Sequence, residues 1–178
     1  MIFRPSHLKG AFVIEPERLA DERGFFARIW CNREFRSHGL NCNLAQASIS
    51  FNRGKGTLRG MHYQAHPHEE AKLVRCTAGE IYDVIIDLRP RSATFRQWDA
   101  VTLSGANRLM LYVPEGFAHG FLTLADDTEV EYHISEFYAP ESARGVRWND
   151  PAFAVRWPVE PAIISDRDAG YPDFNTPQ

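Results

Sequence analysis

Cysteine is scarce in this sequence and uneven in number. The 178 residues include three, Cys31, Cys42 and Cys76, and none of them forms a Cys-x-x-Cys pair. Secreted disulfide scaffolds use an even set of cysteines, and zinc knuckles use closely paired ones. We therefore expect buried free thiols, with neither a disulfide framework nor a zinc knuckle.

Long apolar runs and an excess of one charge are also missing. No stretch approaches the roughly 20 residues of a membrane span, and the start MIFRPSHLKG has no long apolar core of a signal peptide. The formal net charge is -3, with 24% charged and 44% hydrophobic residues, which disfavours nucleic acid as a partner. We expect a cytoplasmic protein without membrane contact, and a single domain over residues 1–178.

What the chain does have is a series of short strand-like segments, separated by Gly, Pro, Asn or Asp. They are GAFVIEP, GFFARIW, LAQASISF, KLVRCTA, EIYDVIIDLRP, QWDAVTLS, RLMLYVP, AHGFLTLA and TEVEYHISEFY. Regular short strands with turn signals between them favour an all-β sandwich or small barrel. KLVRCTA and EIYDVIIDLRP, joined by one glycine, are interpreted as a β-hairpin.

The remaining segments predict little regular structure. ERLADERG, between the first two strands, is interpreted as a charged turn, and NREFRSHGLN predicts a short helix or a loop. After Tyr138 the prolines predict an irregular segment with one or two helical turns.

The region from Thr57 to Gly79 carries unusual charge for a core strand region. Arg59, His62 and Lys72 lie among apolar residues, and a buried charge is costly unless it is paired. The region therefore indicates either a lined cavity or a solvent-facing hairpin. Strict alternation puts Arg59 and His62 on opposite faces, so both reach one ligand only through a bulge or sharp twist at Gly60, or if one serves a neighbouring subunit.

Two motifs point to a cupin barrel. Pro114, Gly116 and His119 have the spacing of the second cupin motif, and Gly60 with the histidines at 66 and 68 matches the start of the first. A metal-binding cupin would next have a carboxylate where Lys72 stands, and an ammonium group does not coordinate a metal. This substitution weakens the metal hypothesis, although Glu69 and Glu70 are close in sequence.

Seven segments in order resemble the dTDP-4-dehydrorhamnose 3,5-epimerase family. They are DERGFFAR, TLRGMHYQ, KLVRCTAGEIYDVIIDLRP, LYVPEGFAHGFLTL, EYHISEFYAP, RWNDP and ISDRD. The resemblance implies a cupin-type jelly roll with a few short helices and no metal or other cofactor. It also implies a homodimer that inverts C3 and C5 of a nucleotide-linked 4-keto-6-deoxyhexose, converting dTDP-4-dehydro-6-deoxy-D-glucose to dTDP-4-dehydro-L-rhamnose.

The same resemblance implies roles for individual residues. His62 would be the base, Asp168 the carboxylate that orients it, Lys72 the enolate stabiliser and Tyr132 the acid on the far face. Substrate-binding positions would be Arg23, Gln46, Ser48, Arg59, His119, Tyr138 and Arg167.

Four positions depart from the family pattern, namely Arg28, Ala47, Ser48 and Ala143. In the family they lie toward the nucleotide, whereas the proton-transfer set is intact. Two alternatives therefore stay open: a single-centre epimerase or ketoisomerase on a related sugar nucleotide, and a metal-dependent or non-enzymatic cupin. The sequence does not choose the downstream pathway.

Overall fold

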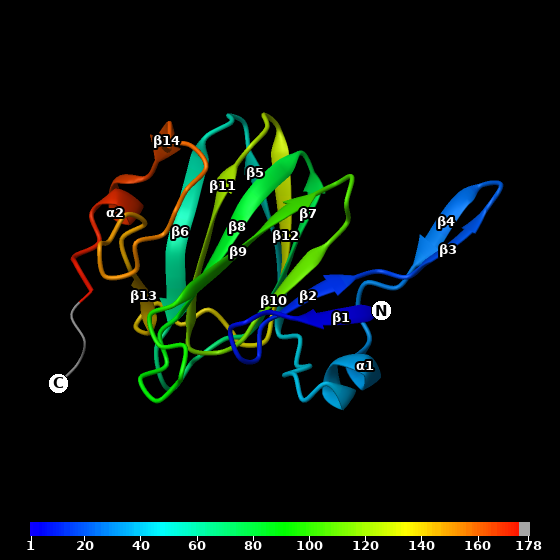
Figure 1. Ribbon diagram of the computed structural model, residues 1–178, viewed down its shortest axis with the longest axis horizontal. Coiled ribbons are helices and arrows are strands. Elements are labelled where there is room, and N and C mark those ends of the chain that lie inside the picture. The colour runs from blue at the N-terminus through cyan, green and yellow to red at the C-terminus, as the bar shows by residue number, and fades with distance from the viewer. Residues whose placement is uncertain (175–178) are drawn as a thin grey trace.

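The computed structural model describes residues 1–174, which form a β-sandwich of two antiparallel sheets (Figure 1). The first sheet has the order β1-β2-β10-β7-β12-β5, and the second has the order β13-β6-β11-β8-β9, with β14 added parallel to β6. The strands are β1 (Ile2–Pro5), β2 (Phe12–Glu15), β3 (Arg18–Asp21), β4 (Gly24–Ala27), β5 (Gln46–Asn52), β6 (Thr57–Gln64), β7 (Lys72–Ala78), β8 (Glu80–Asp87), β9 (Trp98–Ser104), β10 (Met110–Val113), β11 (Phe117–Thr123), β12 (Thr128–Ile134), β13 (Ala143–Gly145) and β14 (Ile163–Ile164). The helices are α1 (Asn32–Ser37) and α2 (Asp166–Ala169).

The main core lies between the two sheets. Val74 and Val130 of the first sheet pack in one buried cluster with Ile81, Ile85 and Phe121 of the second. Burial of large aliphatic and aromatic side chains contributes about 1.5–3 kcal/mol each, and this cluster therefore holds the layers together. The all-β sandwich expected from the strand spacing is confirmed. Within residues 1–174, no helix is long and apolar enough to cross a membrane.

The C-terminal segment covers the outer face of the second sheet. Val146 and Phe153 pack on Met61, Val84 and Ile86, which point away from the main core. This cover explains why both faces of β8 are apolar. In Figure 1 the segment runs past β6 on the side away from the first sheet, and it contains β13, β14 and α2. The irregular tail with a helical turn is confirmed, and the two short strands are additions.

Two local predictions were wrong. β7 and β8 do not form a hairpin, because they belong to different sheets and the chain passes between the layers at Gly79. Val74 of β7 and Ile81 of β8 instead meet across the sandwich, inside the core. The predicted charged turn from residue 17 to 24 is largely strand β3, which pairs with β4 through its register of Arg18 with Ala27.

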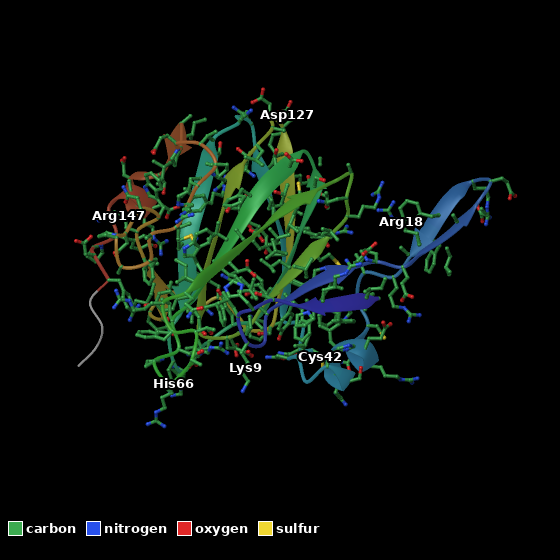
Figure 2. All side chains as sticks on the ribbon, in the orientation of Figure 1. Lys9, Arg18, Cys42, His66, Asp127 and Arg147 are labelled. Atoms are coloured by element: carbon green, nitrogen blue, oxygen red, sulfur yellow. The ribbon has the colours of Figure 1, made fainter. Side chains whose placement is uncertain are left out.

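The β3–β4 hairpin extends away from the sandwich (Figure 1), and Figure 2 shows Arg18 at its near end. Leu19 and Phe26 on this hairpin are 69% and 71% exposed. Arg23 lies in the turn and pairs with Asp21. An exposed apolar arm of this kind is unusual for a monomer and suggests a surface that packs on another protein.

Asp87, at the end of β8, offers a test of how the fold depends on pH. Burial opposes its ionisation, yet hydrogen bonds from Arg89, Ser92 and Thr94 lower the pKa of this carboxyl to about 2. A depressed pKa stabilises the fold above the unfolded-state value near 4, and this contribution is lost as the pH falls toward 2.

We expect Asp87→Asn to lower the free energy of unfolding at pH 7 by about 2 kcal/mol, because the shift from 3.8 to about 2 corresponds to that amount. The variant should also lose less stability than the wild type between pH 4 and pH 2. Urea unfolding across this range measures both effects, with the exposed Asp127→Asn as the control (Figure 2). Parallel pH profiles for Asp87→Asn and the wild type would contradict the prediction.

Candidate active site

A cavity of about 350 Å³ opens between the two sheets. Most of the predicted site residues line it, and they come from five strands, a loop and a helix. The lining residues are Gln46, Ser48, Ser50, Arg59, His62, Tyr63, Gln64, Glu70, Lys72, His119, Tyr132, Ile134, Tyr138, Ala143, Arg144 and Arg167. Of the predicted set, only Asp168 and Arg23 are not in the lining.

Asp168 lies directly behind His62. Its Oδ1 is 2.7 Å from His62 Nε2, and its Oδ2 accepts a hydrogen bond from the Gly60 N–H. The carboxylate is 5% exposed, and Ser165 caps its helix α2. Although burial opposes ionisation, these hydrogen bonds lower the pKa of Asp168. Asp168 is therefore an anion that holds the imidazole and stabilises its protonated form, as the carboxylate does in other His–Asp pairs.

A β-bulge at Gly60 brings Arg59 and His62 to the same cavity. On β11, His119 pairs with His62 and Phe121 pairs with Arg59, so two steps on one strand match three on the other. Gly60 has φ of 138°, and a Cβ there would be 2.5 Å from the Gly120 Cα. Only glycine fits this backbone and this close approach. Of the alternatives that strict alternation left open, the structure shows the bulge.

Tyr132 stands on the sheet opposite His62. It belongs to β12 of the first sheet, where Ser48 and Val74 are its partners on β5 and β7. Burial, and after it the Asp83 carboxylate, raises the pKa of the Tyr132 phenol, while Arg59 acts in the opposite sense. The phenol is therefore protonated at neutral pH and is a potential proton donor facing the imidazole.

The cavity has a second histidine–carboxylate pair at its wall, His119 with Asp83, and Asp83 was not among the predicted site residues. His119 Nε2 is 2.7 Å from Asp83 Oδ1, and the side chains are 4% and 0% exposed. Among the described residues Asp83 Oδ2 has no hydrogen-bond partner. The available signal was the position of Asp83 between Ile81 and Ile85 on one strand face, because a carboxylate there needs a buried partner.

Lys72 lies on β7, which pairs with β12, the strand of Tyr132. Its ammonium nitrogen is 2.9 Å from Glu70 Oε1 and 3.5 Å from the carbonyl oxygen of His62. The register pairs Ile134 with both Lys72 and Gln46, so the three lie in one row across the sheet. The cation is thus within the wall that faces the imidazole. Glu70, which also lines the cavity, was not predicted.

Three arginines give the cavity its remaining positive charge. Arg59 Nε donates to Asn52 Oδ1 at 2.7 Å, and Asn52 is itself buried. Arg144 donates to backbone carbonyls, and Arg167 donates to the Tyr171 hydroxyl. Guanidinium groups without a carboxylate partner suit phosphate oxygens. Arg59 and Arg167 were predicted, whereas Arg144 and Asn52 were missed.

The structure does not bring Arg23 to this cavity. It lies in the turn of the extended hairpin, which points away from the sandwich, so its contact with the diphosphate stays a prediction. Arg28 is also outside and pairs with Glu34. Two other departures from the family pattern, Ser48 and Ala143, do line the cavity.

The first cupin motif does not converge on a metal site. Figure 2 shows His66 pointing away from the protein, and its side chain is 86% exposed beside Glu69. Within residues 1–174, no group of three or more His, Cys, Asp and Glu side chains could hold a metal ion. The residues therefore do not fit the metal-dependent cupin alternative.

Comparison with known proteins gives a consistent family. The profile described as dTDP-4-dehydrorhamnose 3,5-epimerase matches residues 5–176. The dTDP-4-dehydrorhamnose 3,5-epimerase of Methanothermobacter thermautotrophicus is 42% identical over 172 residues, which is 95% of this chain and 92% of that protein.

Solved structures agree. The dTDP-4-dehydrorhamnose 3,5-epimerase of Bacillus anthracis, with TDP and PPi bound, superposes with a TM-score of 0.93 at 39% identity, covering 97% of this chain and 99% of that one. A 3'-monoepimerase from Streptomyces bikiniensis in complex with dTDP-quinovose superposes with a TM-score of 0.86 at 32% identity, covering 95% of this chain and 86% of that one. These matches confirm the cupin-like jelly roll and the isomerase class that the motifs indicated, and the chain belongs to the dTDP-4-dehydrorhamnose 3,5-epimerase family.

Proposed function

We propose that this protein inverts C3 and C5 of dTDP-4-dehydro-6-deoxy-D-glucose, giving dTDP-4-dehydro-L-rhamnose. The observation that carries the proposal is the placement of the His62–Asp168 pair and the Tyr132 phenol on facing sheets of one cavity. Inversion needs a base on one face of the sugar and an acid on the other, and this arrangement supplies both.

Both inverted carbons are adjacent to the C4 ketone, so removal of either proton gives an enolate. His62 takes the proton, and Asp168 stabilises the imidazolium that forms. Lys72 stabilises the negative charge on the ketone oxygen. Tyr132 then donates its proton to the opposite face of the carbon. After each inversion His62 gives its proton to water and the Tyr132 phenolate takes one from water, which resets both groups for the second carbon.

Arginines at the cavity support a diphosphate substrate. Arg59 and Arg167 bind the diphosphate in this proposal, and Arg144 adds a third guanidinium. The predicted contacts of the nucleotide or sugar with Gln46, Ser48, Tyr138 and His119 stay predictions, and all four line the same cavity.

A homodimer accounts for the extended hairpin. The apolar Leu19 and Phe26 are covered by a second copy in this proposal, and Arg23 at the turn reaches the diphosphate in the cavity of that copy. A particle of two 20.3 kDa chains in analytical ultracentrifugation supports the dimer, and a monomer at micromolar concentration contradicts it. A cytoplasmic location also stays a prediction, with the free Cys31, Cys42 and Cys76 in its favour.

Solvent-deuterium incorporation tests the reaction. Incubation of dTDP-4-dehydro-6-deoxy-D-glucose with the protein in D2O, read by NMR and mass, should place deuterium at both C3 and C5. Incorporation at one carbon identifies a single-centre epimerase, the alternative that the similarity to a 3'-monoepimerase favours. No incorporation by the folded protein rules out epimerisation of this substrate.

Arg59→Ala should raise KM by about 10-fold to 100-fold with a much smaller change in kcat, because a charge-assisted phosphate contact is made equally in ground and transition states. Steady-state kinetics and titration with dTDP measure the two effects. Arg53→Ala is the control, because this exposed arginine directly follows β5 and is outside the cavity lining. An unchanged KM would remove Arg59 from the diphosphate site.

A further inference from the structure

The cavity divides its positive groups into two kinds. The two histidines and the lysine each have a carboxylate partner: His62 has Asp168, His119 has Asp83 and Lys72 has Glu70. The arginines have neutral partners instead, namely the Asn52 amide, backbone carbonyls and the Tyr171 hydroxyl. The guanidinium groups therefore have no carboxylate to neutralise them among these partners and can bind an anionic ligand, whereas the Lys72 ammonium is already paired with Glu70.

Glu70 is positioned to hold the Lys72 ammonium. Its side chain is 12% exposed and that of Lys72 is 9% exposed, with 2.9 Å between Oε1 and Nζ. The backbone next to Glu70 is fixed, because Ala71 exchanges hydrogen bonds with Ser135 through its N–H and its carbonyl. The loop that carries Glu70 is fixed at its other end by Gln64, which donates to the His68 carbonyl. The carboxylate is therefore presented from a rigid segment.

Without the Glu70 carboxylate, the Lys72 side chain is free to adopt other conformations. Its four-carbon stem is flexible, and a compact ammonium is attracted to any phosphate oxygen in reach. The second contact of Lys72, to the His62 carbonyl, is long at 3.5 Å. Glu70 is consequently the strong tether of Lys72 within the described residues.

We infer that Glu70 is a positioning residue, which keeps the Lys72 ammonium at the ketone oxygen of the sugar and away from the diphosphate. This inference rests on the proposed function and deepens it, because it assigns how the enolate stabiliser is held. Glu70 itself does not transfer a proton. It acts only through Lys72.

Glu70→Gln tests the inference, since the amide keeps the shape and removes the charge. We expect kcat to fall about 10-fold, because an oxyanion donor is effective only when it is held in place. KM should stay constant or fall, and dTDP should bind more tightly, because the freed ammonium reaches the phosphates. Glu69→Gln, the exposed neighbour, is the matched control and should match the wild type.

A double-mutant cycle with Lys72→Ala tests whether Glu70 acts through Lys72 or in some other way. In the Lys72→Ala background, Glu70→Gln should change the rate of deuterium incorporation no further. Glu70→Asp keeps the ion pair, and hence the fold, but draws the ammonium back by one methylene; it should lower kcat as well. Wild-type rates in Glu70→Gln and Glu70→Asp, or an undiminished Glu70→Gln effect without Lys72, would overturn the inference. Absence of deuterium incorporation by the wild type would instead refute the proposed function.

Discussion

His62→Ala should reduce kcat by about 10³-fold and leave the affinity for dTDP unchanged. Asp168 holds the His62 imidazole at the cavity, and general-base catalysis contributes about 10²-fold to 10⁴-fold. Its removal takes away the acceptor for both the C3 and the C5 proton, so both exchange reactions should stop together. The arginines that line the cavity are untouched, which is why binding should persist.

Deuterium incorporation and calorimetric titration with dTDP measure these two effects separately. His66→Ala is the matched control, because this exposed histidine lies beyond the same strand and outside the cavity lining. Loss of dTDP binding with no specific loss of exchange would assign His62 to the nucleotide. Normal exchange at either carbon in His62→Ala would mean that another base serves that centre.

The bulge at Gly60 is an example of a feature that the sequence pattern could predict. Alternation along TLRGMHYQ set Arg59 and His62 on opposite faces, so both could reach one ligand only through an irregular strand at Gly60 or if one of them served a neighbouring subunit. The observed register shift and the positive φ of Gly60 are that irregularity. A local pattern was sufficient here because the residues that conflict are three positions apart. The strand succession was predictable for the same reason.

Local sequence patterns do not predict which distant segments pair with each other. β7 and β8 are adjacent in sequence and both face the core, which fits a hairpin as well as a crossing between layers. Contacts such as Asn52 with Arg59 and Asp83 with His119 depend on which strands become neighbours. The position of Arg23 outside its own chain's cavity was also beyond a local pattern, because the hairpin that carries it extends away from the sandwich.

Tyr132→Phe should separate proton removal from inversion. The phenol and the imidazole stand on facing sheets, and burial together with Asp83 raises the pKa of the phenol, so it holds its proton at neutral pH. Without the hydroxyl, His62 can still remove a proton and return a deuteron to the same face. We expect exchange to continue while formation of the inverted product falls about 10²-fold or more.

The ratio of deuterium incorporation to inverted product is the decisive measurement, because a general loss of activity lowers both and leaves the ratio unchanged. Tyr82→Phe is the control, since Tyr82 packs on Trp157 at the outer face of the second sheet, away from the cavity lining. A wild-type ratio in Tyr132→Phe would show that the proton on the second face comes from another donor.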